Sequence, residues 1–168
     1  DNRLLAHFPR QRLEAEMVRD ALLAVSGRLD EAAGGSLVNW KNDEYTPDDD
    51  VSAASTRRSV YLPIVRDRVF DVFTIFDFAN PSVGTSKRSP TVVSHQALFF
   101  LNSPLVKESA RAFAASLLTE LPHDQEARIT SAYERALGRP PSEAETRRGV
   151  RFIASATRGP GAEADLAA

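Results

Sequence analysis

The chain has 168 residues, of which 42% are hydrophobic and 26% charged, the balance of an ordinary globular protein. Its 21 basic and 23 acidic side chains leave a net charge of -2, so no overall field attracts nucleic acid or an anionic membrane. The absence of cysteine excludes disulfides, thiolate metal sites and covalent haem attachment within the chain. No apolar run approaches the roughly 20 residues that span a bilayer. The sequence opens without an initiator methionine or a signal-peptide pattern, which indicates an excised piece of a longer protein.

The first part of the sequence predicts one helix followed by polar, irregular chain. Apolar residues recur at helical spacing over 14–26, and Gly27 supplies a left-handed residue that ends the helix. Gly34-Gly35 marks a turn, and the polar stretch 39–56 is expected to be an exposed loop. The apolar face of the helix is expected to comprise Leu13, Met17, Ala21, Ala24 and Val25.

The middle of the chain fits strand and helix almost equally well. Residues 58–65 alternate as a strand does, and Pro63, which cannot donate to a ladder, would place that strand at a sheet edge. The stretch 68–78 combines strand-like composition with helical spacing, and we favour a helix. Residues 80–90 are rich in Pro, Ser and Gly, which predicts a loop. The helical face within 68–78 would comprise Val69, Val72, Phe73 and Phe76.

The second half of the chain predicts helices with clear boundaries. An apolar helical segment covers 96–101, and Ser103-Pro104 then starts another helix, with the serine as its N-cap. Pro122 ends that second helix. Its apolar stripe is expected to comprise Val106, Ala110, Phe113, Ala114, Leu117 and Leu121.

The last two helices are predicted to form a helical hairpin around a turn at Pro140-Pro141. Asp124 is the expected cap of the first of these helices, and Gly138 ends it. Ser142, followed three residues later by Glu145, is a capping box that opens the second. The elements together predict a mainly α, irregular helical domain, with a short edge strand or hairpin left open in its middle. A single domain is expected over 1–158, with a disordered tail over 159–168.

A series of short motifs, in a fixed order over roughly residues 2–145, resembles the planctomycete-specific domain of unknown function called PSD-one. The resemblance covers the C-terminal part of that domain. The motifs are Arg12-Leu13-Glu14-Ala15-Glu16, Arg19-Asp20-Ala21-Leu22-Leu23, Val25-Ser26-Gly27-Arg28-Leu29, Gly34-Gly35, Arg57-Arg58-Ser59-Val60-Tyr61, Phe76-Asp77 followed by Pro81, Arg88, Gln96-Ala97-Leu98, Leu101-Asn102-Ser103-Pro104 and Ala136-Leu137-Gly138-Arg139-Pro140-Pro141.

The resemblance implies a secreted or periplasmic setting in planctomycete-type bacteria, although it implies no established reaction. It also implies a partner domain and often a cytochrome-c-like haem domain upstream in the same polypeptide, with no cofactor in this chain. Many relatives carry a cysteine in the loop before the position of Arg88, where Thr85 lies nearest here, so no thiol role applies. His95 stands where relatives commonly have another residue, so the resemblance gives it no role.

One set of polar residues in the middle of the chain supports two interpretations. The first is an anion-binding or sugar-binding cleft. The second is an internal network that fixes the loop 79–93 against the helices, which we favour because most buried polar groups satisfy one another. Asp77 ends an apolar stretch, so its carboxylate needs charged or hydrogen-bonding partners, and Asp77→Ala is expected to destabilise the fold. The candidate residues are Arg57, Arg58, Asp77, Arg88, Gln96 and Asn102.

Other residues that could do chemistry have simpler explanations. Glu14 and Glu16 could form an acid pair for glycoside hydrolysis, but carboxylates are common and favourable at a helix N-terminus. The three histidines, His7, His95 and His123, lack metal-ligand spacing.

The polar loop contains two further candidates. The run Asp48-Asp49-Asp50 suggests calcium, but Ala53 and Ser59 stand where the EF-hand loop needs glycine and glutamate, so a solvated loop is preferred. Trp40 and Tyr45 could stack on a sugar ring, although large aromatics more often pin a loop to the core.

The sequence favours a non-catalytic structural and interaction domain of a larger exported bacterial protein, beside cytochrome-c-like domains. Its expected partners are the N-terminal remainder of its own domain and the upstream domains, with neither nucleic acid nor a membrane span. The alternative is a carbohydrate-binding or carbohydrate-processing module, with polysaccharide as the partner. Hydrolysis by Glu14 or Asp77 would require two carboxylates about 5 to 10 Å apart in one cleft.

Overall fold

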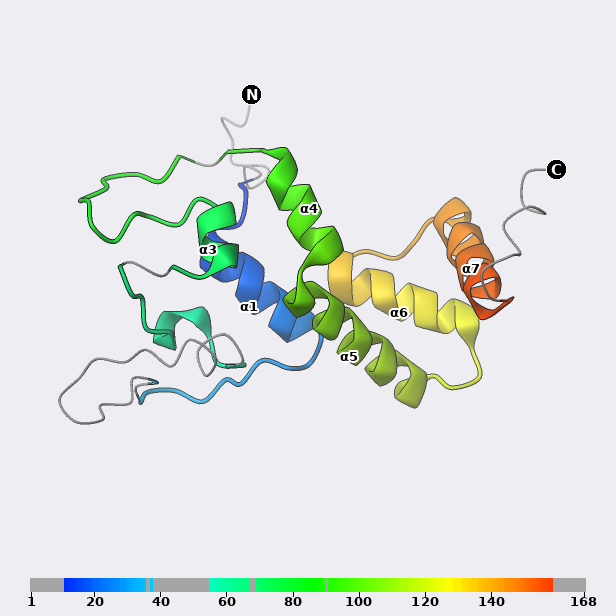
Figure 1. The fold of residues 1–168 in the computed structure, drawn as a ribbon. Helices are drawn as coiled ribbons and strands as arrows, with labels where there is room; N and C mark the ends of the chain where they lie inside the picture. The colour runs from blue at the N-terminus through cyan, green and yellow to red at the C-terminus, as the bar shows by residue number, and fades with distance from the viewer. Residues whose placement is uncertain (1–10, 36, 38–54, 67–68, 90, 159–168) are drawn as a thin grey trace, which may run out of the picture. The chain divides into compact units, whose positions relative to one another are not determined.

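The computed structural model describes residues 11–35, 37, 55–66, 69–89 and 91–158 (Figure 1). The described chain is mainly helical, as the sequence predicts, and none of its helices is long and apolar enough to cross a membrane. The helical elements are α1 (Ala15–Val25), the 3-10 helix η1 (Ser59–Tyr61), α3 (Asp71–Ile75), α4 (Ser94–Asn102), α5 (Pro104–Glu120), α6 (Gln125–Leu137) and α7 (Glu143–Arg158).

The chain divides into two compact units, Asp1–Ser109 and Ala110–Ala168, and α5 runs through the boundary. The single domain expected over 1–158 stays a prediction. Most of the predicted loop 39–56 and all of the predicted tail 159–168 lie outside the described residues.

The helix α1 has the predicted bounds but buries a different face. Gly27 adopts φ +70°, the left-handed conformation expected of a helix stop. Leu13 and Met17, predicted to be buried, are half-exposed. The prediction of the buried face was wrong because one of the buried residues, Arg19, is charged. A charged residue interrupts the helical spacing of apolar residues from which a buried face is predicted. The buried residues of α1 are Ala15, Val18, Arg19 and Leu23.

The core of the first unit is built largely from phenylalanines. α3 confirms the helix favoured over 68–78 but is only five residues long, and Val72, Phe73 and Phe76 of its predicted face are buried. Phe73 stacks on Phe78 with ring centroids 5.0 Å apart, and Phe76 meets Phe99 of α4 edge-on at 5.5 Å. The buried core cluster comprises Ala15, Val18, Leu62, Val72, Phe73, Phe76 and Phe99.

The strand predicted over 58–65 is wrong, because the segment turns through η1 instead. Val60 is 73% exposed. In a half-buried strand, buried and exposed side chains would alternate, and the apolar Val60 would be among the buried ones. The carboxylate of Asp20 accepts hydrogen bonds from the Ser59 N–H at 2.8 Å and from its hydroxyl at 2.6 Å. Side chains of α1 therefore satisfy polar groups that a ladder would otherwise satisfy. Among the described residues we find no strand; Asp30 and Arg57 form an isolated parallel bridge.

Arg19 is the second α1 side chain that holds this segment. It is 4% exposed. Its guanidinium donates to the carbonyl of Arg57 at 2.8 Å, to the Ser59 hydroxyl at 3.3 Å and to the carbonyl of Ser55. A charge buried this deeply is stable only because it is hydrogen-bonded and adjoins the Asp20 carboxylate.

The helices α4 and α5 confirm the predicted segment 96–101 and the start at Pro104. The side-chain oxygen of Gln96 accepts from the Val93 N–H at 3.3 Å, which satisfies a free donor at the start of α4. The predicted stripe of α5 is only partly right. Leu117 is buried, but Ala114 is exposed.

The second unit contains the predicted helical hairpin of α6 and α7. The carboxylate of Asp124 caps α6 by accepting from the Ala127 N–H at 2.8 Å, and Gly138 ends it at φ +67°. The capping box is confirmed, because Glu145 accepts from the Ser142 N–H at 2.8 Å while its own N–H donates back to the Ser142 hydroxyl at 3.4 Å. Hydrogen bonds from Arg139 and then Ser142 hold the pKa of Glu145 at about 2.

The two helices of the hairpin approach closely at a glycine. A Cβ added to Gly149 of α7 would lie 3.0 Å from the Cδ1 atom of Ile129, the buried residue of α6. The small residue thus lets the buried isoleucine pack directly against the α7 backbone.

We predict that Arg19→Met lowers the free energy of unfolding by about 2–4 kcal/mol, because it leaves buried carbonyls without a donor and Asp20 without its cation. Urea unfolding followed by circular dichroism measures the change. Arg58→Met is the matched control, because Arg58 is exposed and its guanidinium makes no hydrogen bond or ion pair with described residues. Equal effects of the two substitutions would contradict the role of Arg19.

Candidate functional site

Arg88 lies in the irregular chain after α3 and is held by the N-terminal carboxylates of α1. Its two terminal nitrogens donate to the two carboxylate oxygens of Glu16, at 2.7 and 2.9 Å, which is the bidentate geometry that suits a guanidinium. One of these nitrogens also donates to Glu14 at 3.2 Å. The guanidinium carbon lies 4.9 Å from the centroid of the Phe78 ring.

Asp77 follows α3 and holds the far end of the same irregular segment. Its carboxylate accepts from the Thr91 N–H at 2.7 Å, from the Thr91 hydroxyl at 2.8 Å and from Arg12 at 3.2 Å. Asp77 has φ +61°, a left-handed conformation that aspartate tolerates better than most side chains. Asp77 therefore forms a tight backbone turn, and its carboxylate accepts three hydrogen bonds.

Gln96 joins this system from α4 and is 7% exposed. Its amide nitrogen donates to the carbonyl of Ile75 at 3.0 Å and to the carbonyl of Thr91 at 3.2 Å. Together with the contacts of Asp77 and Arg88, these bonds fix the chain after α3 against α1 and α4. These hydrogen bonds form a network within the first unit, while the role predicted for Asp77, Arg88 and Gln96 stays a prediction.

Three other residues of the predicted set stand outside this network. Arg58 is exposed immediately before η1, and the Asn102 amide donates only back to the carbonyl of Leu98 in its own helix, at 3.1 Å. Arg57 instead holds the turn at Gly34-Gly35, because its guanidinium donates to the carbonyls of Ala32, at 2.9 Å, and Gly34. Its guanidinium lies over the Tyr61 ring, 4.5 Å from the centroid.

The acid pair suggested by Glu14 and Glu16 is occupied by Arg88. Burial raises the pKa of Glu16, but the hydrogen bonds and the charge of Arg88 outweigh it, so that the pKa of this carboxyl lies below its usual range. A carboxyl held ionised by a bidentate guanidinium is a poor general acid, because donating a proton requires it to be protonated near neutral pH.

The pKa of Asp77 is also lowered. The hydrogen bond from the Thr91 N–H is the main cause, and it outweighs the opposing effect of burial with help from the Thr91 hydroxyl and the charge of Arg12. Asp77 therefore stays ionised at neutral pH and acts as an acceptor.

The first unit contains two cavities that share Asp77. One, of about 410 Å³, is lined by residues that include Arg12, Lys87 and Arg88. The other, of about 640 Å³, is a shallow groove beside α4 that includes Leu98 and Asn102. Arg88 and Asn102 thus line different cavities.

The sequence missed two partners of Asp77, Arg12 and Thr91, and one residue that lines the smaller cavity, Lys87. Arg12 stands in the first motif of the resemblance, two residues before Glu14, but its partner Asp77 is 65 positions away. No local pattern could have joined the two residues.

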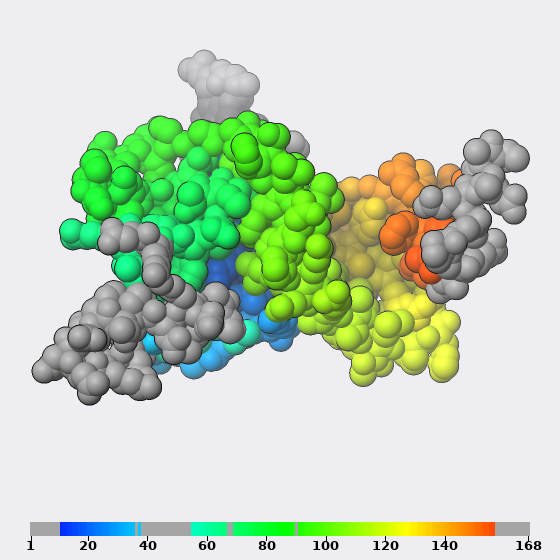
Figure 2. Space-filling view, in the orientation of Figure 1, coloured from blue at the N-terminus to red at the C-terminus, as the bar shows by residue number. Residues whose placement is uncertain are grey.

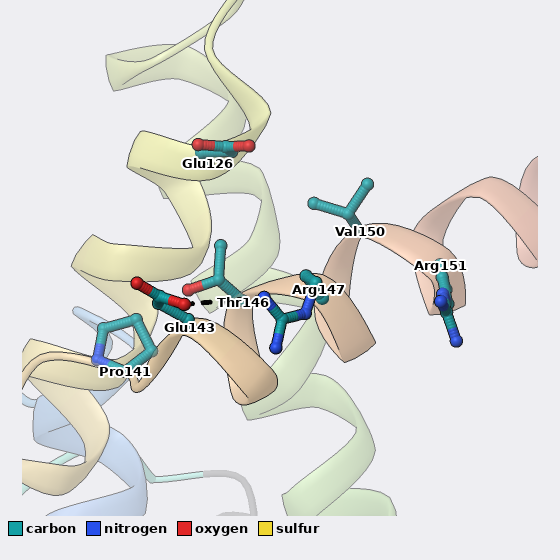
Figure 3. A pocket seen from close by; sticks show the side chains of 7 residues that line it. All are labelled: Glu126, Pro141, Glu143, Thr146, Arg147, Val150 and Arg151. Atoms are coloured by element: carbon teal, nitrogen blue, oxygen red, sulfur yellow. Dashed lines mark ion pairs between the residues drawn. The ribbon is translucent and has the colours of Figure 1, made fainter.

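The second unit has a cavity of about 490 Å³ on the helical hairpin (Figure 3). Glu126 lies on α6, while Glu143 and Arg147 lie one turn apart on α7 and form an ion pair at 3.5 Å. The pair is highly exposed, so it contributes little to stability.

The remaining candidates from the sequence give no assembled site. In the parts of the chain that the structure describes, no group of three histidine, aspartate or glutamate side chains could hold a metal ion. His95 lines the α4 groove. The other candidates, His7, Trp40, Tyr45 and Asp48-Asp49-Asp50, lie outside the described residues.

The described residues form a mainly helical chain in which arginine–carboxylate contacts hold irregular segments against α1. The family described as PSD1, protein of unknown function (DUF1553), matches residues 1–153, so this chain belongs to that family. No curated protein and no solved structure matches it. The restriction to planctomycetes and the placement in the C-terminal part of the family domain stay predictions.

We predict that Asp77→Ala lowers the free energy of unfolding by about 2–3 kcal/mol, since it removes an ionised acceptor and places alanine at a positive φ. Asp77→Asn should cost about 1 kcal/mol, because asparagine tolerates this conformation and keeps one acceptor oxygen. Chemical unfolding of both variants at neutral pH measures the difference. Unchanged unfolding of the alanine variant would contradict the network.

The lowered pKa of Asp77 also predicts a pH dependence. The stability that this carboxylate contributes is present above its unfolded pKa of about 4 and is lost as pH falls through the lower folded pKa. Acidification below about pH 4 should therefore destabilise the natural chain more steeply than Asp77→Asn. If the free energies of unfolding of the two proteins changed equally with pH across this range, the Asp77 carboxylate would not be the cause of the pH dependence.

Proposed function

We propose that this chain is a non-catalytic structural and interaction domain of a larger exported multidomain bacterial protein. Its partners are the N-terminal remainder of its own domain and the upstream domains, including a cytochrome-c-like haem domain. Membership of the family supports the proposal, together with the setting that the resemblance implies.

The observation that carries the proposal is an apolar surface on α4. Leu98 and Leu101 are 52% and 70% exposed, on the face of α4 opposite the buried Gln96 and Phe99. Figure 2 shows α4, in green, at the surface of the first unit. We define the α4 surface as Val92, Val93, Leu98 and Leu101, all of which are exposed.

Large exposed apolar side chains that gather on a helix and the residues just before it are a common mark of a contact between proteins or domains. The groove of about 640 Å³ beside α4 includes Val93 and Leu98 and extends the surface toward α3. An apolar groove suits a helix or a packed loop from a neighbouring domain.

The hydrogen bonds that the central polar residues make within the chain also favour a structural role. Arg88, Asp77 and Gln96 hold segments that have few backbone hydrogen bonds of their own. Side chains whose donors and acceptors are used in this way stabilise a scaffold, and the scaffold in turn keeps the α4 surface in a defined conformation.

We predict that α4 is protected in the complete polypeptide. Hydrogen–deuterium exchange should show slower exchange of amides around α4 in the polypeptide than in this chain alone, because docking buries the α4 surface. Leu98→Glu combined with Leu101→Glu should abolish that difference. The same variant should shift the Tm of the isolated chain by no more than about 2 °C, since both side chains are exposed.

The matched control combines Leu118→Glu with Leu137→Glu, two leucines of the second unit that are 55% and 59% exposed. This variant should leave the protection of α4 intact. Identical exchange at α4 in the isolated chain and in the complete polypeptide would contradict the proposal.

A second candidate function, carbohydrate binding, is favoured by one specific observation. The cavity of about 410 Å³ combines cations, carboxylates and an exposed leucine, and sugar hydroxyls both donate and accept hydrogen bonds. Calorimetric screening of neutral and acidic sugars tests this candidate function directly. The absence of binding heat with both classes of sugar would rule it out.

A further inference from the structure

Three separate segments of the first unit meet at one small cavity. Residues 11–14 lead into α1, residues 76–77 follow α3, and residues 87–88 lie in the irregular chain beyond. The cavity has a volume of about 410 Å³, within the range of small-molecule sites. We call it the Arg12 cavity and use six of its lining residues: Arg12, Leu13, Glu14, Asp77, Lys87 and Arg88.

The charges around the Arg12 cavity balance in number, with three cations against the carboxylates of Glu14, Glu16 and Asp77, but their pairing is uneven. Arg88 is paired with Glu16 and Glu14, and one terminal nitrogen of Arg12 is paired with Asp77. The other terminal nitrogen of Arg12, Nη2, is buried and has no hydrogen-bond acceptor among the described residues. Lys87 is exposed and makes no hydrogen bond or ion pair with the described chain. The ammonium group of Lys87 therefore leaves a local positive charge with which an anionic group can pair.

The same cavity also offers an acceptor and an apolar contact. Glu14 is 54% exposed and uses only one of its two carboxylate oxygens for Arg88, so the other oxygen can accept from a hydroxyl. Leu13 is half-exposed at the rim, where it can cover the carbon face of a sugar ring. Cation, acceptor and apolar contact together match a ligand that carries both a carboxylate and hydroxyls.

We propose that the Arg12 cavity binds a hydroxylated carboxylate of monosaccharide size, a hexuronate. Its carboxylate lies against Lys87, and a ring hydroxyl donates to Glu14. This inference rests on the second candidate function, carbohydrate binding, to which it adds the class of sugar and the residues that select it.

The test is a calorimetric titration of the whole chain with galacturonate, glucose and acetate as probes. Galacturonate should bind about tenfold or more tightly than glucose, because only the acid forms a charge-assisted contact. It should also bind more tightly than acetate, which lacks the hydroxyls. Lys87→Gln should weaken galacturonate binding about tenfold and leave glucose binding unchanged.

Lys107→Gln is the matched control, an exposed lysine on α5 outside the Arg12 cavity, and should bind galacturonate as the natural chain does. Thermal unfolding checks that both variants fold. Equal binding of glucose and galacturonate, or indifference to Lys87→Gln, would overturn the hexuronate site and leave carbohydrate binding standing. Binding of acetate as tight as that of galacturonate would overturn the site as well. No binding of either sugar would overturn both the site and the carbohydrate function.

Discussion

The charged side chains of one short helix, α1, form the hydrogen bonds and ion pairs that fix neighbouring segments of irregular structure. Glu16 binds both terminal nitrogens of Arg88, while Arg19 and Asp20 together bind the segment 55–59. Backbone polar groups outside helices and sheets must find partners when they leave water. In the first unit the side chains of α1 supply many of these partners, so the fold of the irregular chain depends on the integrity of this helix.

This arrangement has a consequence for function. A side chain that is engaged with a charged partner is poorly placed to bind or transform a substrate, so the surfaces that remain for function are those that the network leaves out. They are the exposed leucines of α4 and, in the cavity beside Arg12, the exposed Lys87, which is unpaired among the described residues. The network holds both surfaces in place, because Gln96 ties α4 to the chain after α3 and Asp77 ties that chain to Arg12.

Local features were predictable from the sequence where their cause is local. Asp124, Gly138 and the Ser142–Glu145 pair act on residues within one turn, and all three behave as predicted. The buried face of α1 was mispredicted because Arg19, a charged residue, lies within it. The strand over 58–65 was mispredicted because its partner is the Asp20 side chain, 39 positions away from Ser59.

In the candidate site, too, single residues could be predicted from their local sequence, whereas long-range contacts could not. Asp77, Arg88 and Gln96 could be singled out because each stands beside apolar chain and needs a partner. Their partners Arg12, Glu16 and Thr91 could not be assigned, since those contacts depend on how α1, α3 and α4 pack.

The most direct test of the role of α1 is a double-mutant cycle on its best-formed contact, with Glu16→Gln, Arg88→Gln and the double variant compared by urea unfolding. The two side chains are each about three-quarters buried, and their bidentate contact is geometrically favourable. We expect a coupling free energy of about 1–2 kcal/mol in favour of the natural pair. Additive effects, with a coupling below about 0.3 kcal/mol, would contradict the claim that α1 holds the irregular chain through its charged side chains.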